Sequence, residues 1–282
     1  MKRPALEFAR RAAIFLCLAS LWYTQSALYA QAPQAPPQSG PAPPPPPPVN
    51  PQGALERAEA LYANLNYSGA LGLFREAVSQ GNVEAMMYMG LMYSAGQGTP
   101  RNYAEAMYWF RRAADKGDGQ AMCNIGVFYF QGLGVPKDYA NAMRWFHAGA
   151  DVGNSQAAFN VGVLIRDGLG VDVNYNEALG YFRKAANGDN PQAMNSLGVM
   201  FQNGQGVGVD YGEALVWFQK AAGQGSAAAM HNIAQLYEKG LGVTADPEEA
   251  AKWRRKAEEL EKDGPPIELR KPDLRQPGLT KP

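Results

Sequence analysis

The stretch YFQGLGVPKDYANAMRWF, residues 129–146, contains two glycines, Gly132 and Gly134, just before the predicted start of a helix. A Gly-x-Gly pair at a helix N-terminus can hold a phosphate group, because the backbone comes close and its free amides point outward. Glycine also forms simple turns, because it adopts left-handed backbone angles without a steric penalty. The stretch therefore predicts either a nucleotide site or a turn, and the rest of the sequence decides between them.

The same pattern returns every 36 residues in five consecutive segments that align without a gap. The segments begin at Met87, Cys123, Phe159, Asn195 and His231. One column holds glycine in four copies and alanine in the last: Gly90, Gly126, Gly162, Gly198 and Ala234. A second column holds glycine in all five: Gly98, Gly134, Gly170, Gly206 and Gly242. A fixed period of this length indicates stacked supersecondary units.

Each unit is predicted to be a pair of helices. In the second copy, apolar residues recur at helical spacing both before Gly132 and after Asp138. Asp138 is predicted to cap the second helix, since its side-chain oxygen can accept from the free amides of the first turn. The cap is itself a column of Asn102, Asp138, Asn174, Asp210 and Asp246. Because the glycines follow a helix rather than a strand, and recur in every copy, we interpret them as turns and not as a phosphate site.

Small and aromatic residues are predicted to build the core between the helices. Gly126 would let two helix backbones approach closely, and Phe146 would fill the space between units. Residues 54–81 carry a weaker form of the second-helix pattern and predict a divergent first unit. The final helix has Arg254 and Glu258 at positions that are aromatic or small in the other copies, which is typical of a polar terminal cap.

The motif AMCNIGVFYFQGLGVPKDYANAMRWFHAGA, residues 121–150, resembles the Sel-one-like repeat (SLR) family, which is related to the tetratricopeptide repeats. The resemblance rests on the Gly-x-Gly turn and on an aromatic column near the end of each unit, formed by Trp109, Trp145, Tyr181, Trp217 and Trp253. It is strong over residues 82–258 and weak over residues 54–81. The resemblance implies an all-α, right-handed superhelix of helix pairs with a concave groove. It also implies binding of a protein or peptide in that groove rather than catalysis.

In such a solenoid, the first helix of each pair would line the groove. The predicted groove residues lie two and three positions before the first glycine column, one position after it, and one turn further on. They are Asn124, Asn160, Ser196 and Asn232, then Cys123, Phe159, Asn195 and His231, then Val127, Val163 and Val199, and finally Phe130 and Arg166. An asparagine ladder can pair with an extended peptide backbone, because the amide both donates and accepts. Alternatively, these amides bond to neighbouring backbone between repeats, and the sequence leaves both possibilities open.

The two ends of the chain differ in composition from the repeats. Residues 1–30 join a basic start to an apolar run, which predicts a signal peptide cleaved after Ala30, with an uncleaved membrane anchor as the alternative. Residues 31–53 are rich in proline and predict an extended linker. The five tandem repeats would then occupy residues 82–263, followed by a disordered tail over residues 264–282. We therefore expect export, to the periplasm in the first place and outside the cell as a second possibility.

Composition and residue types argue against several functions. The chain has 26 basic and 26 acidic residues, whereas nucleic-acid binding calls for clustered positive charge. His147 and His231 are the two histidines, and they fall on different predicted helices without a metal-ligand spacing or a nucleophile nearby. We expect a non-enzymatic adaptor or scaffold of the cell envelope without cofactor or metal. The alternative is a binder of envelope glycan or its precursors, or a secreted host-interacting factor.

Overall fold

The computed structural model describes residues 51–263, and this range folds into twelve α-helices without a strand. The predicted signal peptide, most of the predicted linker and the predicted tail lie outside the described residues. The helices follow one another as pairs: α2 (Pro51–Ala63) with α3 (Tyr67–Ser79), α4 (Val83–Ala95) with α5 (Tyr103–Ala114), α6 (Gly119–Gln131) with α7 (Tyr139–Asp151), α8 (Ser155–Asp167) with α9 (Tyr175–Asn187), α10 (Pro191–Asn203) with α11 (Tyr211–Gly223), and α12 (Ala227–Lys239) with α13 (Pro247–Asp263). This arrangement confirms the predicted all-α solenoid.

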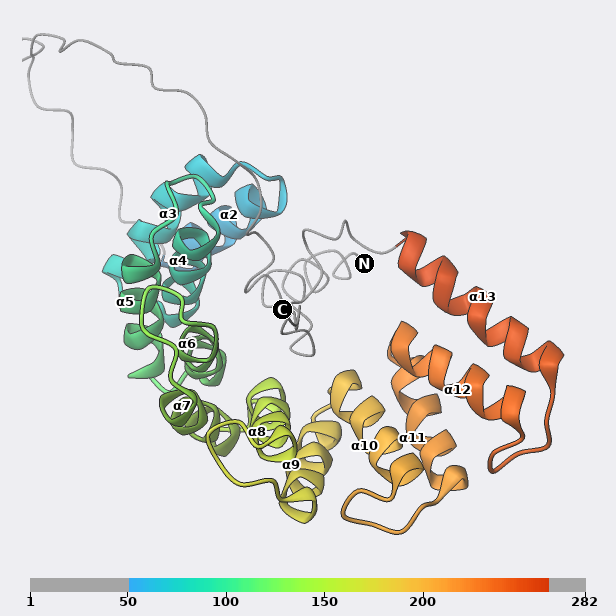
Figure 1. The fold of residues 1–282 in the computed structure, drawn as a ribbon. Coiled ribbons are helices and arrows are strands. Elements are labelled where there is room, and N and C mark those ends of the chain that lie inside the picture. Colours follow the sequence, from blue (N-terminus) through green and yellow to red (C-terminus); the bar gives the residue numbers. More distant parts are fainter. Residues whose placement is uncertain (1–50, 264–282) are drawn as a thin grey trace, which may run out of the picture.

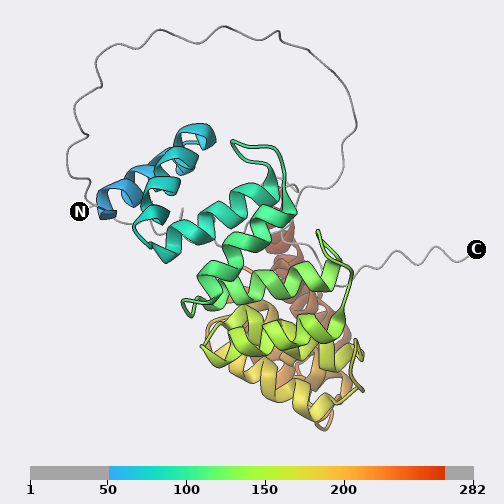
Figure 2. The same cartoon turned by 90° about the vertical axis from the view of Figure 1, so that its left-hand side faces the viewer.

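The pairs stack along an arc, and each contacts its neighbours in the chain (Figure 1). Helices α4, α6, α8, α10 and α12 follow the inner side of the arc, whereas α5, α7, α9 and α11 follow the outer side. Figure 2 shows the same stack from the side, with the first pairs at the top, the middle pairs beneath them and the red last helices behind. The inner helices are those that the sequence predicts for the groove.

Side-chain caps set the starts of the helices. The predicted cap column holds for α5, α7, α9 and α11, and Asp246 likewise accepts from the amides of Glu248 and Glu249 at 3.0 and 2.9 Å. The inner helices have caps of their own, which are Asn82, Asp118, Asn154, Asn190 and Ser226. Each cap satisfies an amide that the helix leaves unpaired.

The Gly-x-Gly pair forms the turn between the helices of a pair. Gly132 ends α6 with φ of 78°, and its amide donates to the carbonyl of Phe128 at 2.8 Å. Gly134 has φ of 66°, and a Cβ there would lie 2.6 Å from Cβ of Tyr103 in the preceding pair. The turn interpretation is therefore confirmed. The second glycine also permits close stacking of one pair on the next, which the sequence pattern did not reveal.

A column of phenylalanines forms the centre of the core. The rings of Phe74, Phe110, Phe146, Phe182 and Phe218 are at most 1% exposed. A Cβ at Gly126 would lie 2.6 Å from the Phe146 ring. A Cβ at Gly90, Gly162 or Gly198 would likewise lie too close to the phenylalanine ring that faces it. The predicted role of this glycine column is thus refined, because a phenyl ring rather than a second helix backbone takes the space.

The first helix starts earlier than predicted. The proline-rich linker was expected to run through residue 53, but α2 begins at Pro51. Proline is tolerated in the first turn of a helix, where its missing amide would have no partner in any case. Among the described helices, none is both long and apolar enough to cross a bilayer.

Candidate binding groove

The thirteen predicted groove residues all lie on α6, α8, α10 and α12, the inner helices of Figure 1. Their exposure divides them into two sets. The buried set contains Cys123, Asn124, Asn160, Val163, Asn195 and Ser196, which are 1–8% exposed. The accessible set contains the half-buried Val127, Phe130, Phe159, Arg166, Val199 and Asn232, together with the exposed His231. The second set therefore presents accessible surface on the inner helices, whereas the first set presents almost none.

The buried asparagines bond across neighbouring pairs. Asn160 Nδ2 donates to Cys123 Sγ at 3.5 Å, and Asn124 Nδ2 donates to the sulfur of Met87 at 3.9 Å. Nearer the C-terminal end of the groove, Asn232 Nδ2 donates to Asn195 Oδ1 at 2.8 Å. At these positions the structure shows bonding between repeats, but the partners are side chains and not the predicted backbone.

Two glutamines that sequence reasoning missed extend this network. Gln120 Nε2 donates to Asn124 Oδ1 at 3.2 Å, and its own Oε1 accepts from Asn154 Nδ2 at 3.1 Å. One repeat later, Gln156 is joined in the same way to Asn160 at 3.3 Å and to Asn190 at 3.2 Å. Their spacing of 36 residues was a signal that could have identified them. Because this amide ladder links successive inner helices, it fixes their separation and the shape of the groove.

Asn160→Ala is expected to lower the free energy of unfolding by about 1–3 kcal/mol, because it removes a buried donor to Cys123 and leaves the half-buried amide of Gln156 without its acceptor. Lys184→Ala is the control, since Lys184 is 46% exposed and meets Asp151 at only 3.6 Å. Such a surface pair contributes about 0–1 kcal/mol. Urea unfolding followed by circular dichroism measures both variants, and equal stability of the two would show that the ladder does not support the fold.

The remaining candidates for chemistry are held in structural contacts. Burial raises the pKa of the Cys123 thiol to about 12, so the group stays protonated at neutral pH. His147 Nδ1 lies 3.2 Å from the hydroxyl of Tyr181, and His231 Nε2 lies 3.6 Å from Glu261. Within residues 51–263, no group of three or more His, Cys, Asp or Glu side chains is placed to hold a metal ion.

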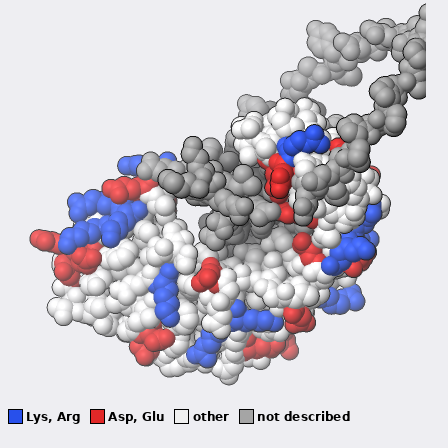
Figure 3. All heavy atoms as spheres, turned by 180° about the vertical axis from the view of Figure 1, so that it is seen from behind, with Lys and Arg blue, Asp and Glu red and all other residues white. Residues whose placement is uncertain are grey.

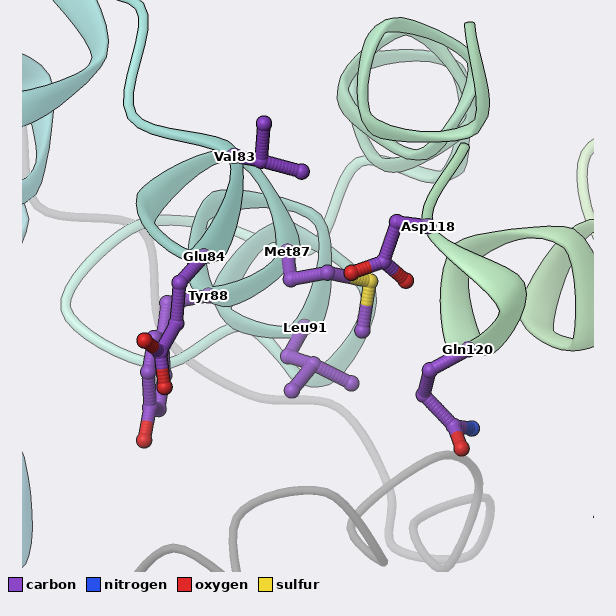
Figure 4. A pocket seen from close by; sticks show the side chains of 7 residues that line it. All are labelled: Val83, Glu84, Met87, Tyr88, Leu91, Asp118 and Gln120. Carbon is purple, nitrogen blue, oxygen red and sulfur yellow. The ribbon is translucent and has the colours of Figure 1, made fainter. Parts of the chain in front are cut away.

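A cavity of about 310 Å³ lies between α4 and α6 (Figure 4). Its lining consists of Val83, Glu84, Met87, Tyr88, Leu91, Asp118 and Gln120. Met87, Tyr88 and Leu91 occupy the same columns as the predicted groove residues Cys123, Asn124 and Val127. Counting from Gly90 as well as from the later glycines would have identified them.

Two carboxylates, Glu84 and Asp118, flank this largely apolar cavity, and Figure 4 shows Met87 between them. Asp118 caps α6 by accepting from the amide of Ala121 at 2.7 Å. Burial raises the pKa of Asp118, the charge of Glu84 raises it further, and hydrogen bonds from backbone amides oppose the shift. Elsewhere, on the face that Figure 3 shows, basic and acidic side chains are interspersed.

Comparison with known proteins agrees with the repeat seen in the structure. The Sel1 repeat model matches five consecutive segments: residues 83–118, 119–154, 155–190, 191–226 and 227–261. Each matched segment begins within a residue of the start of an inner helix and covers one helix pair. No curated protein matches the chain.

Several solved structures resemble this one. A Sel1 repeat protein from Oxalobacter formigenes is 30% identical, with a TM-score of 0.70 over 74% of this chain and 88% of that chain. The protective antigen c5321 of uropathogenic Escherichia coli, which displays an SLR fold, is also 30% identical, with a TM-score of 0.64. This match covers 74% of the present chain and 46% of the antigen, so the chain spans about half its length. The immunity protein Pa5087 from Pseudomonas aeruginosa, at 19% identity and a TM-score of 0.53, shares the fold.

Proposed function

Because the chain belongs to the Sel1 repeat family of protein-interaction scaffolds, we propose that it holds a protein or peptide segment along its inner helices without catalysing a reaction. The observation that carries the proposal is the row of accessible side chains on these helices. Val127, Phe130, Phe159 and Val199 are half-buried there, and Asn232 adds an amide. Apolar anchors with a few polar groups are typical of peptide-binding grooves.

The amide ladder supports this proposal through the rigidity of the groove. Asn124 and Asn160 are 1% and 3% exposed, and their bonds tie each inner helix to the one before it. A groove whose shape is set before binding loses little conformational entropy when a ligand enters. In this account the buried asparagines position the accessible residues instead of contacting the ligand.

The same proposal places the protein outside the cytoplasm, as an adaptor of the cell envelope. Its support is the basic and apolar composition of residues 1–30, which lie outside the described range. Fractionation of cells that make the full chain, beside a form lacking residues 2–30, tests this point. Recovery of both forms in the cytoplasm alone would contradict export.

A second candidate is a binder of envelope glycan or a secreted factor that meets a host. Phe130 and Phe159 favour a glycan binder, because half-buried rings on the inner helices can stack on sugar rings. The similarity to a protective antigen supports the second form. Capture from envelope extract treated with either a protease or a glycosidase separates peptide from glycan ligands.

Val127→Arg combined with Val199→Arg is expected to weaken binding of the captured partner by at least about tenfold, because two charges would enter an interface that is partly removed from water. The matched control is Val216→Arg on the outer helix α11, where the side chain is 42% exposed. Calorimetry measures affinity, and circular dichroism checks that the helices persist. Equal affinity of the double variant and the control would place the binding surface elsewhere.

A further inference from the structure

The last helix of the stack ends beside the groove. After each earlier second helix, the next inner helix begins within three or four residues, so the chain returns to the inner side of the arc. Helix α13 holds the second place in its pair and runs for 17 residues, whereas α11 has 13. Its last turn brings Glu261 Oε1 to 3.6 Å from Nε2 of His231, a predicted groove residue on α12. The chain therefore leaves the described range at the C-terminal end of the groove (Figure 1).

Residues 264–282 are long enough to run back along the groove. Side-chain hydrogen bonds of 2.8, 3.2 and 3.5 Å join α12 to α10, α10 to α8 and α8 to α6. Packed helices lie about 8–10 Å apart, so three such steps place α6 roughly 24–30 Å from α12. An extended proline-rich segment advances about 3.1 Å per residue, so roughly ten residues cover this distance. Residues 264–274 alone would therefore reach α6.

The inner helices along this path are nearly free of charge. Helices α6 and α10 contain no charged residue. On α8, the guanidinium of Arg166 is held by the carboxylate of Asp167 at 2.6 and 2.8 Å. Between these helices the accessible surface comes from half-buried apolar side chains, which are Val127, Phe159 and Val199. Such a surface favours an occupant with apolar anchors over a strongly charged one.

The C-terminal segment carries anchors of this kind within the required length. Ile267, Leu269 and Leu274 are aliphatic and fall inside residues 264–274. The neighbouring prolines favour an extended backbone, which places side chains along a groove instead of folding into a helix. Because the segment is tethered at α13, its effective concentration at the groove is of the order of millimolar, so even weak contacts suffice to fill it.

We propose that residues 264–282 dock along the inner helices from α12 toward α6 and cover the groove until a partner displaces them. The occupant is thus a segment of the chain itself, and the partner competes with it for Val127, Phe159 and Val199. The inference rests on the proposed function and adds regulation of the same site. The place where α13 ends selects this segment, because it emerges beside His231.

A spin label on the C-terminal segment tests this placement in the full chain. Gln276→Cys carries a nitroxide in a Cys17→Ser background, and the buried thiol of Cys123 stays unlabelled because it is 1% exposed. The expected result is loss of the amide signals of α6 and α8 around Val127, with the signals around Val216 on the outer helix α11 retained. Signal loss confined to the surroundings of α13, or equal on inner and outer helices, would overturn the proposal.

Two companion samples identify the occupant. Ile267→Asp with Leu269→Asp should restore the signals of α6, because the charged segment no longer docks on an apolar surface. In the second sample, spin-labelled chain without isotopes is mixed with isotopically enriched chain without the label. Loss of α6 signals in that mixture would show that a second copy supplies the segment, and would contradict docking within one chain.

Binding of the captured partner gives an independent measurement. Ile267→Asp with Leu269→Asp is expected to raise the affinity at least about threefold, because the groove is then uncovered in a larger fraction of molecules. Gln276→Asp with Thr280→Asp is the matched control, since it adds the same charge to the same segment without removing an aliphatic side chain. Equal affinity of the two double variants would overturn the competition.

The proposed function and this inference fail in different ways. If Val127→Arg with Val199→Arg abolishes capture while the spin label never reaches α6, the groove function stands and the docked segment does not. If the label reaches α6 but the valine double variant still captures its partner, the segment docks as proposed and the partner binds elsewhere. That second result would refute competition for the groove.

Discussion

Phe146→Ala is expected to lower the free energy of unfolding by about 3–5 kcal/mol, the usual cost of removing a fully buried aromatic ring. The ring is 1% exposed and fills the space beside Gly126 on the facing helix. Because glycine has no side chain, residue 126 itself cannot help to close the cavity. The loss should therefore lie near the upper part of this range.

Chemical unfolding followed by circular dichroism measures this loss, and amide hydrogen exchange shows where it falls. Since each pair contacts mainly its neighbours, exchange should accelerate most in α6, α7 and α8. Val216→Ala is the control, because its side chain is 42% exposed and its loss should stay within about 0.5 kcal/mol. A loss below about 1 kcal/mol for Phe146→Ala would contradict the account of the core.

Gly134→Val is expected to cost about 2–5 kcal/mol, from about 1–2 for a left-handed backbone and about 1–3 for overpacking. The residue has φ of 66°, and its Cβ would lie 2.6 Å from Cβ of Tyr103. Both penalties apply together, since the turn brings the backbone against the preceding pair. Thermal unfolding of the variant beside the parent chain measures the sum.

Gly153→Val isolates the backbone part of this cost. Gly153 has φ of 91°, but a Cβ there would meet no heavy atom within 4 Å. Gly153→Val should therefore lose only the part of the free energy of unfolding that comes from the left-handed backbone. If both variants lose the same stability, the contact with Tyr103 does not matter and stacking tolerates a side chain in the turn.

The period of the sequence was enough to predict the helix pairs, the turns and the caps of the second helix in each pair. Gly132 and Asp138 act as predicted because turns and caps depend on residues close in the chain. The direction of Asn124 and Asn160 was harder to predict, since the two candidate roles differ by a modest rotation about the helix. The two amides point toward the sulfur atoms of Met87 and Cys123 on the preceding inner helices. These contacts depend on how neighbouring repeats stack.

The cavity also depends partly on features that the sequence predicts and partly on contacts between repeats that it does not predict. Met87, Tyr88 and Leu91 stand in columns that the repeat identifies, so their place on an inner helix was predictable. Their position beside Asp118 depends on how α6 stacks on α4, which the alignment of the repeats does not specify. The alignment shows that Glu84 and Asp118 stand where the later junctions have an amide pair. Only the hydrogen bonds of those junctions show that this pair links neighbouring inner helices.

The central claim is that the partner lies along the inner helices. Photo-cross-linking of the captured partner tests it most directly, with a photoreactive residue placed singly at Val127, Val199 or Gln235 on the inner helices. The matched outer positions are Tyr108 and Val216, which are 50% and 42% exposed. The account predicts cross-links from the inner positions and none from the outer ones. Cross-links from Tyr108 or Val216 with none from the inner helices would contradict it.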